Sequence, residues 1–183
     1  MIPPLFRTPN RTIALLYGAI VAQARDARFY KAYRVPDTVL GRFDLIVLHL
    51  ALVLRRMREG DAALRALAQR VFDAFCRDMD QNLREMGISD QGVPRQMRRV
   101  GEAFYGRAQA YDAALGESGE DALAQALARN VYAEASEPEV AAAQLAAYVR
   151  LAVKTLDRQR LEDVARGAVR FPEPAAIFAP AAE

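Results

Sequence analysis

Apolar residues recur every three or four positions along most of this chain, which is the spacing of one face of an α-helix. The longest example runs from Leu64 to Met86, where apolar side chains form one continuous stripe. No segment shows sustained alternation of apolar and polar residues, the pattern of a half-buried strand, and no internal repeat is visible. We therefore predict an all-α fold: a single-domain, irregular bundle of about seven to eight helices.

One predicted helix is apolar on nearly every side. Between Phe43 and Leu54 the sequence reads FDLIVLHLALVL, which leaves no polar face of ordinary width. Because such a helix is typical of the centre of a bundle, we expect residues 41–58 to be centrally buried. The apolar run at 45–54 is too short to cross a bilayer, which takes about 20 apolar residues.

Start and stop signals divide the rest of the sequence. Pro9 suits a first helical position, and Asp37-Thr38 precedes the central helix as a capping pair. Gly87 is predicted to end a helix as a left-handed cap, and Pro94 opens the next one. Further helices are expected over residues 119–133, after Ser136, and over residues 158–167.

The end of the chain differs in composition from the rest. Residues 171–183 read FPEPAAIFAPAAE, a Pro- and Ala-rich stretch that we expect to be extended and poorly ordered. The predicted organisation is therefore a helical domain over residues 1–170, followed by an extended tail over residues 171–183.

The residue types that carry most catalysis and metal binding are scarce. The 183 residues include one cysteine, Cys76, and one histidine, His49, so we predict no disulfide, no metal site and no cofactor. Cys76 lies on an apolar stripe and is predicted to be a small core residue. His49 is predicted to be buried and hydrogen-bonded, with an enzyme that uses it in a buried pocket as the alternative. Neither a P-loop nor a GxGxxG motif is present, and we predict no catalytic activity.

Charge is distributed unevenly along the chain. Residues 1–60 carry ten basic and four acidic side chains, a net charge of +6, whereas residues 116–183 carry seven basic and eleven acidic ones, a net charge of −4. A basic first third permits a patch that faces anionic lipid or RNA. An ordinary solvated surface is the alternative.

A basic cluster follows Pro94. The spacing of Arg95, Arg98 and Arg99 places their side chains on one helix face, near the N-terminus, where positive charge opposes the helix dipole. We take these arginines as candidate contacts to an acidic partner, a lipid headgroup or RNA. Solvated arginines, relieved by Glu102 or Asp90, are the alternative.

A second candidate surface precedes Pro36. Phe29, Tyr30 and Tyr33 alternate there with basic residues, a composition that suits a membrane interface or a protein partner. The alternative is a short helix that packs on the core through Phe29 and Tyr33.

Two phrases around the basic cluster carry a family resemblance. MDQNLREMGISD is followed by VPRQMRRVGEAFYGRAQAYDAAL, and together they resemble the ubiquinol–cytochrome c chaperone family, the assembly factors for cytochrome b of the respiratory cytochrome bc complex. The resemblance covers roughly residues 25–175. The residues of these phrases that we add to the candidate partner-binding set are Arg84, Glu85, Asp90, Tyr105 and Arg107.

The resemblance implies a non-catalytic, all-helical chaperone. Its implied client is newly made or newly inserted cytochrome b, and a small partner chaperone or the ribosome is implied as an additional partner. No DNA partner is expected. A membrane-surface or RNA-binding adaptor, based on the basic first third, is the competing function.

Location is predicted from the start of the chain and from the resemblance. The opening MIPPLFRTPNRT has prolines and an arginine where a signal peptide has its apolar core. Compared with the mitochondrial members of the family that it resembles, we expect this protein to lack their long N-terminal extension. We expect a bacterial-type member in the cytoplasm, with peripheral contact to the inner membrane left open.

Overall fold

The computed structural model describes residues 9–117, 119, 121–135 and 137–175. These residues form helices joined by short connections, with no strand among them, so the all-α prediction is confirmed. The helices, in chain order, are α1 (Pro9–Ala24), α2 (Ala27–Lys31), α3 (Val39–Arg58), α4 (Ala62–Glu85), α5 (Val93–Gly116), α6 (Asp121–Val131), α7 (Pro138–Asp157) and α8 (Leu161–Ala165).

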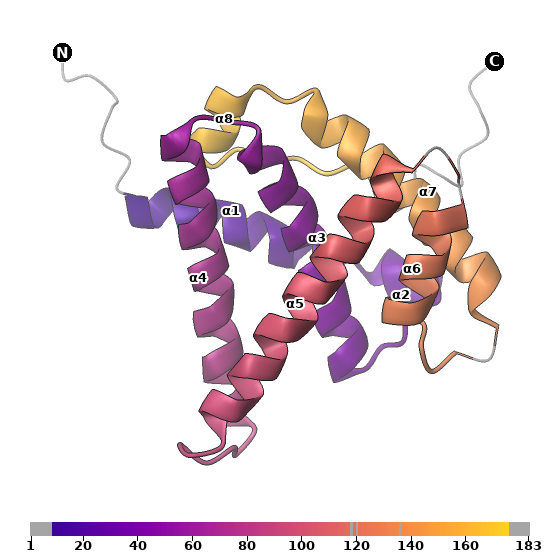
Figure 1. The fold of residues 1–183 in the computed structure, drawn as a ribbon, viewed down its shortest axis with the longest axis horizontal. Helices are drawn as coiled ribbons and strands as arrows, with labels where there is room; N and C mark the ends of the chain where they lie inside the picture. Colours follow the sequence, from indigo (N-terminus) through magenta and orange to yellow (C-terminus); the bar gives the residue numbers. More distant parts are fainter. Residues whose placement is uncertain (1–8, 118, 120, 136, 176–183) are drawn as a thin grey trace.

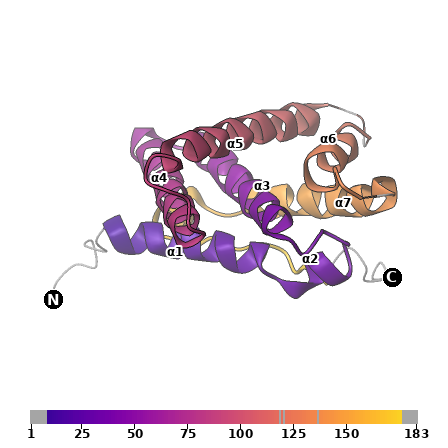
Figure 2. The same cartoon turned by 90° about the horizontal axis from the view of Figure 1, so that it is seen from below.

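The central helix is where the sequence predicts it. α3 lies between α1 on one side of the molecule and α5 on the other (Figure 2), and it also packs against α4, α6 and α7. Its residues from Asp44 to Val53 are all buried. The broad apolar surface that distinguished this helix in the sequence is therefore covered by neighbours on every side.

Local capping explains several of the helix ends. The side chain of Thr38 accepts a hydrogen bond from the Gly41 N–H at 3.1 Å and begins α3, and Asp61 accepts from the Leu64 N–H at 2.8 Å and begins α4. Gly87 adopts a φ of 83°, the left-handed conformation predicted for the residue after α4.

α4 and α5 form a long helical hairpin that extends to one end of the molecule, with residues 86–92 as the turn (Figure 1). α1 packs against α4, and the two are joined by a 2.6 Å hydrogen bond from the Tyr17 hydroxyl to Asp78 Oδ2. α6 and α7 pack together at the opposite end of α5. The hairpin is thus held by α1 and α3 along part of its length, while its turn lies away from the other helices.

His49 is the centre of a buried polar network. Its Nδ1 lies 2.7 Å from the Leu45 carbonyl oxygen, which can only accept, so Nδ1 carries the proton. Nε2 then accepts from the Tyr148 hydroxyl at 2.9 Å, and that hydroxyl accepts from Gln23 Nε2 at 3.0 Å. The chain of hydrogen bonds connects α1, α3 and α7, which gives His49 the structural role that the sequence predicts.

The segment 171–174 packs on this network. The Phe171 ring meets His49 edge to face with centroids 5.1 Å apart, and the Tyr33 hydroxyl donates to the Pro174 carbonyl at 2.5 Å. Glu173 forms an ion pair with Arg28 at 2.5 Å. The first residues of the predicted tail therefore contact the domain. The predicted domain boundary at residue 171 stays a prediction, because residues 176–183 lie outside the described residues.

Burial of His49 makes stability depend on pH. Desolvation lowers the pKa of His49 from 6.5 to about 4, so between these pH values the unfolded chain binds a proton that the folded chain does not. The free energy of unfolding therefore falls as the pH is lowered through this window, by about 3 kcal/mol in total. His49→Gln removes this contribution.

We expect the free energy of unfolding of His49→Gln to be lower than that of the parent chain at pH 7.5. At pH 4 the difference between the two free energies is expected to be smaller by about 3 kcal/mol. Urea unfolding at a series of pH values measures it. Other titrating groups, Asp44 included, are common to both proteins and cancel in the comparison. A difference that stays constant with pH would contradict this account of His49.

Candidate functional site

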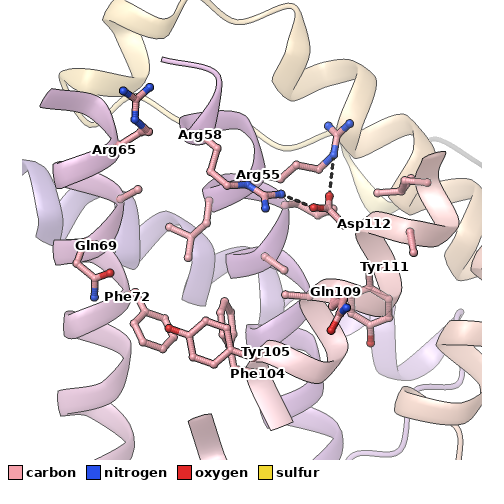
Figure 3. Close-up of a pocket in the computed structure, with 17 residues that line it drawn as sticks. Arg55, Arg58, Arg65, Gln69, Phe72, Phe104, Tyr105, Gln109, Tyr111 and Asp112 are labelled. Carbon is pink, nitrogen blue, oxygen red and sulfur yellow. Dashed lines mark hydrogen bonds and ion pairs between the residues drawn. The ribbon is translucent and has the colours of Figure 1, made fainter. Parts of the chain in front are cut away.

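An open groove lies between α3, α4 and α5 (Figure 3). Its volume is about 700 Å³, within the range of pockets that hold organic ligands or side chains of a partner. Its lining residues are Ala51, Leu52, Leu54, Arg55, Arg58, Arg65, Ala68, Gln69, Phe72, Phe104, Tyr105, Ala108, Gln109, Tyr111, Asp112, Ala113 and Leu115. α3 forms the floor, and α4 and α5 form the walls.

Side-chain size explains why the helices stand apart here. At one end of the groove Phe72 of α4 meets Phe104 of α5 with ring centroids 4.8 Å apart, and Tyr105 lies 5.6 Å from Phe72. Further along, small residues such as Ala68 and Ala108 take the positions that face the groove. The aromatic rings keep α4 and α5 apart, and alanine side chains are too small to fill the space between these helices. The groove therefore stays open.

The other end of the groove is basic. Asp112 accepts from Arg58 at 2.5 Å and pairs with Arg55 at 3.2 Å (Figure 3). Arg65 donates to the Gly60 carbonyl and forms no ion pair with any described residue. Three arginines and one aspartate line the groove, which gives it a net charge of +2. The site therefore combines an apolar middle with a positively charged end.

Arg107 does not line the groove and pairs instead with the buried Asp44 of α3. Its Nη2 is 2.8 Å from Asp44 Oδ1, and the two side chains are 17% and 2% exposed. The N–H bonds of the guanidinium do not point at Oδ1, so the contact is an ion pair rather than an aligned hydrogen bond. Burial raises the pKa of Asp44 to about 6, an effect that Arg107 partly opposes. The AFYGR phrase thus supplies a structural ion pair through its arginine.

The predicted arginine cluster lies at the exposed end of the hairpin. Arg95, Arg98 and Arg99 are exposed and form no ion pair within the described part of the chain. Asp90 pairs instead with Arg84, which also binds Asp80 at 2.7 Å. Among the described residues the three arginines pair with neither Asp90 nor Glu102, so the ion-pair relief in the alternative interpretation is absent there.

The remaining hairpin candidate, Glu85, is exposed and accepts a hydrogen bond from Gln81 at 2.8 Å.

The aromatic segment before Pro36 corrects one expectation. Phe29 and Tyr33 are fully buried, because α2 packs on the core and turns both rings toward Tyr148. They are not contacts for a partner in this conformation, and the alternative of a short packed helix holds. Tyr30 is half-buried, and its hydroxyl donates to the Ala24 carbonyl at 2.8 Å.

Only Tyr105 of the predicted site residues lines the groove, where it is 61% exposed. The apolar lining residues of α4 and α5 give no separate signal in the sequence, because their spacing is that of an ordinary core stripe, and the polar ones resemble a solvated helix face. One signal was present in the sequence: the alanines at 51, 68 and 108 leave gaps in stripes that are otherwise built of large side chains.

The described residues also limit the chemistry. None of the described helices is long and apolar enough to span a membrane. Within the same residues no group of three or more His, Cys, Asp or Glu side chains is placed to hold a metal ion. Cys76 is half-buried against the core, and burial raises the pKa of its thiol, which disfavours the nucleophilic thiolate.

Comparison with known proteins places these features in a family. A sequence profile described as "Ubiquinol-cytochrome C chaperone" matches residues 31–171. The ubiquinol-cytochrome-c reductase complex assembly factor 1 of Xenopus laevis is 28% identical over 149 residues, which cover 81% of this chain and 74% of the relative. The protein of that name from Mus musculus is 25% identical over 149 residues, 81% of this chain but 50% of its own length.

A solved structure has the same fold as this chain. The crystal structure of the Cbp3 homolog from Brucella abortus aligns with a TM-score of 0.83 and 41% sequence identity, and the alignment covers 91% of each chain. The helical arrangement described above is therefore shared with an experimentally determined relative.

Removing the Arg107 side chain tests the buried ion pair. Arg107→Met leaves Asp44 buried without its partner, which is expected to lower the free energy of unfolding at pH 7.5 by about 3–5 kcal/mol. The loss should shrink at acidic pH, where Asp44 is protonated. Urea unfolding measures both effects.

The double variant Asp44→Asn/Arg107→Met is the control. It leaves no charge buried and is expected to lose less stability than Arg107→Met alone. Equal losses in the two variants would show that packing of the Arg107 stem, rather than the ion pair, stabilises this position.

Proposed function

This chain belongs to the ubiquinol–cytochrome c chaperone family, and we propose that it binds newly made cytochrome b and supports assembly of the ubiquinol–cytochrome c reductase complex without catalysing a reaction. The family match covers residues 31–171, which include most of the helical core and both walls of the groove. Named relatives are assembly factors of that complex. In this role the protein would act at the face of the inner membrane.

The observation that carries the proposal is an open groove with an apolar middle in a member of this family. A newly made membrane protein exposes apolar segments that must be shielded from water before assembly. A groove lined by Leu54, Phe72 and Tyr105, which are partly or largely exposed, can cover part of such a segment, because contact between apolar surfaces removes both from water.

A holding role needs no catalytic group. The ring nitrogens of His49 are both hydrogen-bonded inside the core, and Asp44 is paired with Arg107. The polar groups around the groove are arginines, glutamines, tyrosines and one aspartate, which suit recognition by charge and hydrogen bonding.

Recovery of this protein with tagged cytochrome b tests the proposal. We expect the parent chain to be recovered from cells, and Ala108→Trp, which fills the middle of the groove, to be recovered at least about tenfold less. Ala143→Trp on an exposed position of α7 is the matched control and should bind as the parent does. Circular dichroism confirms that both variants fold.

No recovery of the parent chain, together with normal levels of the reductase complex in a deletion strain, would rule out the proposed function. Normal recovery of a folded Ala108→Trp variant would keep the function and move the client to another surface.

A second function, a membrane-surface or RNA-binding adaptor, is favoured by one observation: Arg95, Arg98 and Arg99 are exposed at the end of the hairpin and form no ion pair with another described residue. Under this function, binding to anionic vesicles or to RNA weakens with salt and is lost in the triple alanine variant. Under the main proposal, the same variant still recovers cytochrome b.

A further inference from the structure

We infer that the groove takes an amphipathic helix of its protein partner, apolar on one face and acidic at the end that lies over Arg58 and Arg65. The inference rests on the proposed function of the groove and adds the chemistry of the segment that it holds. Three features carry it: the backbone of the walls, the length of the groove and the position of its charges.

The walls disfavour an extended peptide. Groove residues belong to three α-helices, over 51–58 of α3, 65–72 of α4 and 104–115 of α5, and helix ends occur at the basic end, where α3 and α5 finish and α4 begins. Backbone N–H and C=O groups in helix interiors are already bonded within their own helix. An extended occupant would lose hydrogen bonds to water and find no backbone partners in return. A helix satisfies its own backbone and avoids that cost.

The length of the groove fits about three helical turns. Its α5 wall extends from Phe104 to Leu115, which at 1.5 Å per residue is about 16 Å. A helix of that length presents apolar side chains at positions i, i+3 or i+4, and i+7. These side chains would lie over Leu54, Ala108 and Leu115, which are only partly buried.

The charges specify one end of the occupant. Arg65 has no ion-pair partner among the described residues, and the side chain of Arg58 is 60% exposed although it binds Asp112. Asp112 pairs with both Arg55 and Arg58 (Figure 3), and Arg55 also lies 3.8 Å from Asp157, so Asp112 is the one carboxylate that Arg58 contacts and Arg65 contacts none among the described residues. Carboxylates of the bound helix at this end would pair with Arg58 and Arg65, whereas a basic residue of the bound helix there would be repelled.

Labelled synthetic peptides test the inference directly. Each peptide has about 14 residues and an apolar face of leucines. One carries a pair of glutamates in its first turn and another carries the pair in its last turn. Each of these has a counterpart with lysines in place of the glutamates. Fluorescence anisotropy with the full chain is expected to show that at least one glutamate peptide binds about tenfold more tightly than its lysine counterpart at low salt. The preference should shrink as salt is raised.

Charge reversal in the protein makes the test specific. Arg58→Glu/Arg65→Glu is expected to invert the preference, so that the lysine peptide binds more tightly. Arg70→Glu/Arg77→Glu, on exposed positions of α4 outside the groove, is the matched control and should leave the preference unchanged. Ala108→Trp should weaken the binding of both peptides.

Several results would overturn the inference. Two results would rule out an acidic end on the bound helix. One is equal affinity for the glutamate and lysine peptides, and the other is a preference for glutamate that the Arg58→Glu/Arg65→Glu variant retains. Absent peptide binding, together with binding of a fluorescent fatty acid that Ala108→Trp blocks, would assign the groove to a lipid chain.

The outcome is separable from that of the proposed function. Recovery of cytochrome b without a peptide preference would keep the client and reject the acidic helix. A peptide preference without recovery of cytochrome b would keep the chemistry of the groove and reject the client.

Discussion

Burial of α3 is the constraint on which the arrangement of the other helices depends. A helix that is apolar on nearly every side is stable in water only if neighbours cover it all round. α1, α4, α5, α6 and α7 each pack against it, and α2 reaches it through the contact of Phe29 with His49. The groove lies over the stretch of α3 where α4 and α5 stand apart, and Ala51 and Leu52 on its floor are themselves buried.

The two buried polar side chains of α3 are accommodated in different ways. His49 is neutral and fully hydrogen-bonded to Leu45 and Tyr148, so its burial leaves no orphaned polar group. Asp44 is paired with a guanidinium whose N–H bonds are poorly aligned, and the Tyr111 hydroxyl nearby has no hydrogen-bond partner among the residues that the structure describes. The α3–α5 interface is therefore less completely satisfied than the α3–α7 interface, and it is the α3–α5 interface that borders the groove.

Much of the fold could be predicted from local sequence signals, because these signals act over a few residues. The capping residues Thr38 and Asp61, the left-handed Gly87 and the apolar surface of α3 all act in the way their chemistry indicates. The groove could not be predicted, since it depends on how far α4 and α5 diverge, which packing between distant segments decides. Burial of Phe29 and Tyr33 likewise depends on Tyr148, more than one hundred residues away in sequence.

Contacts between the two ends of the chain also determine when the core can be completed. Gln23 donates to the Pro172 carbonyl and Tyr33 to that of Pro174, pairs separated by 149 and 141 residues. During synthesis the first helices emerge long before these partners exist. The surface around His49 that Phe171 covers must therefore stay uncovered until nearly the whole chain has left the ribosome, so this chaperone is itself an incompletely folded protein for most of its own translation.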